Sequence, residues 1–266
     1  MSYSDGLAPK ADGSALPGEA PKPYSWIRAL LGIFLLPAIL MLITYSVVQV
    51  LQGTGETFDP TVGFALSSST FLISAIVYIA VTGKLKDILD FLKLREFKWR
   101  YIAIGLAGAI ATYILAIFVG MIAVLISGFG SEGAGIGTNS TSETIGGLAQ
   151  NHSILLLGFL IAVLAPLGEE IFFRGAMLTS IVQESSSKWL KFAAVVIISV
   201  IFGLFHMQEP TGTMADVLAV VTPALVGVTA AVLTLWFNSL YPAIFTHLFY
   251  NGLVLLIITA STGSLG

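Results

Sequence analysis

Apolar runs of about 20 consecutive residues dominate the sequence after its first 28 positions. A helix of that length crosses the hydrocarbon core of a bilayer, because each residue adds about 1.5 Å to an α-helix. Such runs occur at 29–51, 62–82, 101–127, 154–182, 192–206, 218–237 and 241–260. The sequence therefore predicts an all-α membrane bundle of about seven transmembrane helices, or eight if the long fourth run is divided.

Composition agrees with this fold class and excludes several functions. The 266 residues are 56% hydrophobic and only 10% charged, whereas a soluble domain carries about a quarter charged residues. The net charge of -3, without a basic patch interleaved with aromatic residues, argues against a nucleic-acid partner. The absence of cysteine excludes disulfides, thiolate catalysis and cysteine-ligated metal.

The chain divides into a short tail and a membrane domain. Residues 1–24 are rich in Pro, Gly, Ala and Ser and have little to bury, so we expect a disordered tail. Residues 25–266 form the predicted membrane domain, and its first span is too long for a signal peptide and is expected to be an uncleaved anchor. The stretch 84–100, KLKDILDFLKLREFKWR, is apolar at helical spacing and rich in lysine and arginine, so it predicts an interfacial amphipathic helix.

The basic residues between the spans predict the orientation. Lysines and arginines precede the first span and lie between the second and third spans and between the fourth and fifth. The loops 128–153 and 207–217 contain neither residue. By the positive-inside rule the N-terminus is cytoplasmic and the C-terminus lies outside.

A few strongly polar residues interrupt the late spans. They are Glu169, Glu170, Arg174, His206, His247 and Asn251. A charged residue at the centre of a membrane helix costs roughly 2.5–3.5 kcal/mol on insertion scales, so each needs a partner or a wet cavity. A buried network that only holds helices together is the simpler interpretation. Six such residues on three spans favour a functional site.

Helical spacing separates the two glutamates. Glu170 and Arg174 are four residues apart, so they share a helix face and are expected to form an ion pair. Glu169 is rotated by about 100° from Glu170 and remains available for chemistry. Pro166, just upstream, removes a backbone hydrogen bond and predicts a bend near Glu169.

These residue types suit hydrolysis of an amide without a nucleophilic serine or cysteine. A glutamate in an apolar site, with a histidine beside it, can take a proton from water. His247 and Asn251 are also four residues apart, and together they could stabilise the negative oxygen that forms when this water attacks a carbonyl. His206 appears nearer the outer end of its span than Glu169 does, so the three groups meet only if the fifth span begins earlier or tilts.

Three motifs on these spans resemble those of a known family. EEIFFRG (169–175), FGLFH (202–206) and HLFYN (247–251) are similar to the E-E-x-x-x-R, F-x-x-x-H and H-x-x-x-N motifs of the CAAX-protease and bacteriocin-processing intramembrane endopeptidases. The resemblance covers a catalytic core at about 153–260 and implies a glutamate-dependent peptidase without a cofactor.

The resemblance also implies the role of each motif residue. Glu169 and His206 would activate water, and His247 with Asn251 would form the oxyanion site. The supporting residues would be Glu170, Arg174 and Phe202. The implied partners are the lipid bilayer and a hydrophobic or lipidated peptide of CAAX or bacteriocin-leader type, in what the compact chain suggests is a bacterial cytoplasmic membrane.

Three other functions fit the same residues. A zinc peptidase could use Glu169, His206 and His247 as ligands, although an H-E-x-x-H pair is absent from the sequence. A proton-coupled transporter could use the glutamates and histidines as a relay. A non-catalytic immunity or scaffold protein could keep the network for packing alone.

Overall fold

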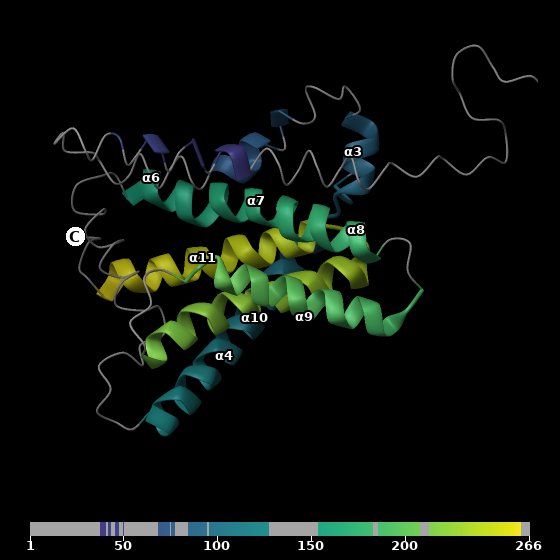
Figure 1. The fold of residues 1–266 in the computed structure, drawn as a ribbon. Coiled ribbons are helices and arrows are strands. Elements are labelled where there is room, and N and C mark those ends of the chain that lie inside the picture. Colours follow the sequence, from purple (N-terminus) through teal and green to yellow (C-terminus); the bar gives the residue numbers. More distant parts are fainter. Residues whose placement is uncertain are drawn as a thin grey trace, which may run out of the picture.

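The structure, a computed structural model, describes residues 38–40, 42–43, 46–47, 50, 69–74, 76–77, 85–94, 96–127, 154–182, 186–207 and 213–261. Within these residues all regular secondary structure is helical (Figure 1). The longer elements are α3 (Leu85–Phe91), α4 (Arg100–Ser127), α9 (Lys188–Leu204), α10 (Met214–Phe237) and α11 (Tyr241–Ser261). The all-α prediction is therefore confirmed.

One further helical segment changes its hydrogen-bond pattern along its length. It consists of α6 (Ile154–Phe159), the π-helical turn η1 (Leu160–Leu164), α7 (Ala165–Glu170), the π-helical turn η2 (Ile171–Leu178) and α8 (Thr179–Val182). These pieces follow one another without a gap, so the chain remains helical from 154 to 182. We refer to the whole segment as the glutamate helix.

Three of the described helices are long and apolar enough to cross a membrane: Arg100–Ile126, Met214–Phe237 and Tyr241–Ala260. Large apolar side chains on α4 face outward, since Ile114, Leu125 and Ile126 are 62%, 70% and 72% exposed. Such a surface is stable against lipid and would be an aggregation hazard in water. The protein is an integral membrane protein.

The helix boundaries agree with most of the spans predicted from the sequence. The third, fourth, sixth and seventh spans coincide with α4, the glutamate helix, α10 and α11 to within four residues at either end. The fifth begins at Lys188 rather than at 192. The predicted tail, the loop 128–153 and most of the first two spans lie outside the described residues.

The stretch 84–100 forms a shorter helix than its sequence pattern indicates. Helix α3 ends at Phe91, and Lys93 has a left-handed backbone with φ of 58°. Residues at the start of α11 hold this turn, because Leu240 N–H donates to Lys93 O at 3.1 Å and Tyr241 Oη donates to Leu94 O at 2.6 Å. Burial lowers the pKa of Lys93, and the positive charge of Lys191 lowers it further.

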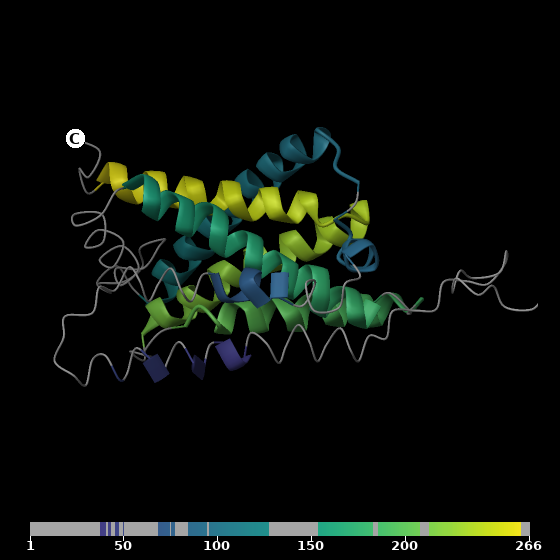
Figure 2. The same ribbon diagram turned by 90° about the horizontal axis from the view of Figure 1, so that it is seen from above.

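Helix α11 is the central element of the bundle. It packs against α4, α10, η1 and α7, while α9 packs against α10 and η2. The glutamate helix and α11 run alongside each other, and α4 crosses them obliquely (Figures 1 and 2).

Two glycines allow α4 to lie very close to α11. A methyl group on Gly105 would lie 2.9 Å from Thr246 N, and one on Gly108 would lie 2.5 Å from Thr246 Oγ1. Small residues at such crossings are typical of packed membrane helices, where close van der Waals contact replaces the hydrophobic effect.

Candidate active site

The two glutamates lie on a short α-helical stretch between two π-helical turns. In η1, Ala165 N–H donates to Leu160 O, five residues earlier. Pro166 follows and has no N–H, so a regular α-helical ladder cannot continue through this point. The π-helical turns absorb this irregularity. Such turns are rare in proteins, and many of those that occur lie at functional sites.

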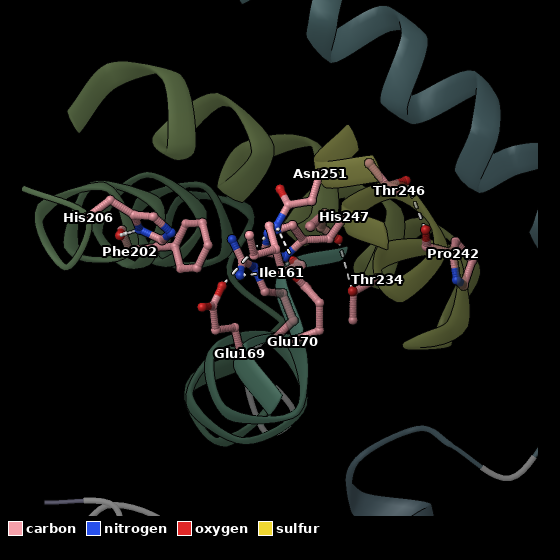
Figure 3. Close-up of polar contacts among 12 residues, drawn as sticks. Ile161, Glu169, Glu170, Phe202, His206, Thr234, Pro242, Thr246, His247 and Asn251 are labelled. Atoms are coloured by element: carbon pink, nitrogen blue, oxygen red, sulfur yellow. Dashed lines mark hydrogen bonds and ion pairs between the residues drawn. The ribbon is translucent and has the colours of Figure 1, made fainter. Parts of the chain in front are cut away.

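Glu170 and Arg174 form the ion pair that their spacing predicts. Arg174 Nη1 donates to Glu170 Oε1 at 2.9 Å, and both side chains are fully buried. The same oxygen lies 2.9 Å from His247 Nδ1. Because a carboxylate only accepts hydrogen bonds, His247 Nδ1 carries the proton in this contact. Glu170 therefore joins the glutamate helix to α11 (Figure 3).

The guanidinium of Arg174 lies among aromatic rings rather than in water. Its carbon is 4.3 Å from the centre of the Phe202 ring and 5.7 Å from that of Phe173. Cation–π contacts of this kind contribute more when the cation is desolvated. On α10, Gly227 leaves room for the guanidinium, since a methyl group there would lie 2.9 Å from Arg174 Nη2.

Glu169 occupies a different position from its neighbour. Its side chain is 18% exposed, and its Oε2 lies 3.7 Å from His247 Nε2. This distance is too long for a hydrogen bond but within the range of an ion pair. His247 thus lies between the two carboxylates, with Nδ1 towards Glu170 and Nε2 towards Glu169. Among the described residues, Glu170 and not Glu169 forms an ion pair with Arg174, so Glu169 is the less constrained carboxylate.

His206 lies on the turn that follows α9 and is not joined directly to Glu169. Its Nδ1 donates to Phe202 O at 2.9 Å, which leaves Nε2 as an acceptor. The Phe202 ring lies 4.6 Å from the His206 ring and 5.6 Å from the His247 ring, so it packs against both histidines. Although α9 begins earlier than predicted, the described residues show no hydrogen bond or ion pair between His206 and Glu169 (Figure 3).

Asn251 is engaged with the glutamate helix. Its Nδ2 donates to Ile161 O, in η1, at 3.0 Å. One amide hydrogen is used in this contact, and an asparagine amide has two. Asn251 follows His247 by one turn of α11, so the pair contacts the glutamate helix at two levels.

Sequence reasoning missed two residues that shape this site. Ser199 is fully buried on α9, and its Oγ has no hydrogen-bond partner among the described residues. Ser199 Cβ would lie 3.0 Å from a methyl group on Gly227, which places Ser199 beside the space that Arg174 fills. A serine within an apolar span is the only sequence signal for the first residue. A lone glycine in α10 gave no signal for the second.

The described residues contain no group of three or more His, Cys, Asp or Glu side chains placed to hold a metal ion. Of the zinc set of Glu169, His206 and His247, the structure brings Glu169 and His247 together at 3.7 Å, and among the described residues His206 has no hydrogen bond or ion pair with either.

The helices and this cluster together define an integral membrane protein with a buried cluster of acidic and basic side chains. Residues 151–253 match the family described as Type II CAAX prenyl endopeptidase Rce1-like. This match confirms the resemblance indicated by the three motifs and implies a membrane-embedded protease. Comparisons with curated proteins and with solved structures found no match.

Proposed function

We propose that the protein is an endopeptidase that hydrolyses peptide bonds of a membrane-associated substrate with water activated by Glu169. The observation that carries this proposal is the different environment of two adjacent carboxylates. Glu170 is fully buried and accepts from Arg174 and His247, whereas Glu169 is partly exposed and forms no ion pair with an arginine of the described residues. A carboxylate that is held near a histidine, and yet reachable, is suited to act as a general base.

In the proposed reaction, Glu169 takes a proton from water while the water oxygen attacks the carbonyl carbon of the scissile bond. The C–O bond forms, the carbonyl oxygen becomes negative, and the C–N bond then breaks. The proton held by Glu169 passes to the leaving nitrogen, which restores the carboxylate. His206 Nε2 is free to accept from the attacking water once substrate has brought the water within its reach.

The tautomer of His247 sets a condition on the oxyanion role. Its Nδ1 proton is directed to Glu170, so a neutral His247 has only a lone pair on Nε2. Nε2 therefore donates to an oxyanion only in the imidazolium form of His247, in which both ring nitrogens carry a proton. The second amide hydrogen of Asn251 would provide the other donor. Glu170 and Arg174 therefore act through His247.

The site suits a hydrophobic or lipidated peptide, because it lies among helices whose outer surfaces face lipid. We place the N-terminus in the cytoplasm, since the basic residues of the described chain cluster before α4 and at the start of α9. A bacterial cytoplasmic membrane is the proposed location.

The test is cleavage of labelled peptides by the purified full-length protein in detergent, with prenylated CAAX peptides and bacteriocin leader peptides as substrates. Glu169→Gln should lower the rate by roughly 10²–10⁴-fold, the usual contribution of a general base. The matched control is Glu96→Gln, because Glu96 is exposed and pairs with Lys98 at 3.3 Å, outside the cluster around Glu169. This variant should cleave like wild type.

A chelator separates the glutamate mechanism from the zinc alternative. Loss of activity in Glu169→Gln with no effect of chelator supports the proposal. Chelator-sensitive cleavage would instead assign the site to zinc. Full activity of Glu169→Gln would exclude Glu169 as the base.

A further inference from the structure

The backbone at the start of the glutamate helix has a carbonyl that its own helix does not satisfy. In η1, Ala165 N–H donates to Leu160 O, so it is not directed to Ile161 O four residues earlier. The next N–H in a π-helical ladder would belong to residue 166, which is proline and has none. Ile161 O therefore receives no donor from either position. Ile161 is partly buried in a membrane protein, where a carbonyl without a donor costs free energy, so a partner from outside the helix is favoured.

Asn251 provides that partner from the neighbouring helix. Its Nδ2 donates to Ile161 O at 3.0 Å and thereby takes the place of the N–H that Pro166 lacks (Figure 3). A second π-helical carbonyl is satisfied in a comparable way, since Thr179 Oγ1 donates to Arg174 O at 3.1 Å. Side chains thus complete the hydrogen bonding of both irregular turns around the two glutamates.

The hydrogen bond from Asn251 to Ile161 O lies close to Glu169 and His247 along both helices. Asn251 is one turn beyond His247 on α11, and Ile161 is about two turns before Glu169 on the glutamate helix. A change in the pairing at η1 by one residue would rotate everything downstream by about 100°. Glu169 would then leave its position 3.7 Å from His247 Nε2.

We infer that Asn251 is a positioning residue that replaces the missing N–H of Pro166 and so fixes the rotation of Glu169 relative to His247. This role is distinct from donation to an oxyanion, which would use the other amide hydrogen. Its effect on the rate depends on the proposed function, whereas its effect on stability does not.

A double-mutant cycle between Asn251→Ala and Pro166→Ala tests the inference in the full-length protein. Pro166→Ala restores a backbone N–H beside Ile161 O, so the cross-helix donor becomes less necessary. Asn251→Ala alone should lower the melting temperature by roughly 2–4 °C, the shift expected for one lost hydrogen bond in a chain of this size. Adding Pro166→Ala should recover most of that shift. It should also recover part of the lost kcat, with KM little changed.

The matched control is Pro223→Ala, because Pro223 also lies inside a membrane helix, α10, but is far in sequence from the Ile161 turn. Its effect should simply add to that of Asn251→Ala. If Asn251→Ala does not fold, Asn251→Leu has a similar shape without the donor and takes its place in the cycle.

Additive melting temperatures for Pro166→Ala and Asn251→Ala would overturn the inference. Recovered stability without any recovered kcat would also overturn it, because Asn251 would then act on the rate only through the substrate. If wild type cleaves no peptide, the proposed function fails on its own, and the melting temperatures still decide whether Asn251 compensates for Pro166.

Discussion

The buried ion pair at the centre of the site gives the sharpest test of how the cluster is held together. We predict that Arg174→Met strongly destabilises the protein. Met has a similar length and no charge, so the substitution removes the 2.9 Å contact with Glu170 while filling much of the same space. It leaves the Glu170 carboxylate fully buried with His247 as its remaining partner.

The size of the effect follows from the surroundings of the pair. Removing one member of a buried ion pair costs about 3–5 kcal/mol, because the other charge remains without compensation. The guanidinium also loses its position 4.3 Å from the Phe202 ring. At about 2–4 °C per kcal/mol for a chain of roughly this size, the melting temperature should fall by roughly 6–20 °C.

Glu170→Gln should relieve most of this loss in the Arg174→Met background. The glutamine is neutral and its amide oxygen still accepts from His247 Nδ1, so the buried charge disappears with its partner. The measurement is thermal unfolding in detergent, followed by the loss of the monodisperse peak in size-exclusion chromatography. Arg100→Met is the matched control, because Arg100 is exposed at the start of α4 and should change stability by about 0.5 kcal/mol or less.

The reasoning would be refuted if Arg174→Met were as stable as Arg100→Met. It would also be refuted if the double variant were no more stable than Arg174→Met, because the cost would then come from lost packing and not from the uncompensated charge.

Two further substitutions test the packing around the site. Gly227→Ala should lower the free energy of unfolding by about 1–3 kcal/mol through overpacking, because its methyl group would lie 2.9 Å from Arg174 Nη2 and 3.0 Å from Ser199 Cβ. Thermal unfolding measures this loss, and an unchanged stability would contradict the close packing. Lys93→Gly should stabilise by about 1 kcal/mol, because glycine adopts a φ of 58° without strain. The pKa of Lys93 is lower in the folded protein than in the unfolded chain. Between these two pKa values the unfolded chain binds more protons, so the free energy of unfolding of the wild type should rise with pH. Lys93→Gly should remove that rise, and an unchanged pH dependence would show that Lys93 is not its source.

The sequence was most informative where periodicity alone decides the outcome. Apolar run length located the ends of the glutamate helix at 154 and 182, and the spacing of four residues predicted the Glu170–Arg174 pair. Both depend only on the geometry of a single helix. The family match over 151–253 confirmed the resemblance that the three motifs indicated, and each of these motifs lies within one helix or at its end.

The arrangement between helices could not be predicted in the same way. Spacing put His247 and Asn251 on one face of α11, but it could not show that His247 lies between the two glutamates or that Asn251 reaches a backbone carbonyl. The contact of the Phe202 ring with both His206 and His247 depends on how α9 packs, which periodicity does not specify. Pro166 indicated an irregularity, but not that π-helical turns would absorb it.

The close crossing of α4 and α11 has a mechanical consequence for the site. Gly105 and Gly108 bring the backbone of α4 against Thr246, the residue directly before His247. Tightly packed backbones resist deformation, so the contact with α4 makes the part of α11 that carries His247 rigid. His206 has a different support, because it lies on a turn beyond the end of α9. If a peptide binds as proposed, we therefore expect His206 to move more than His247 does.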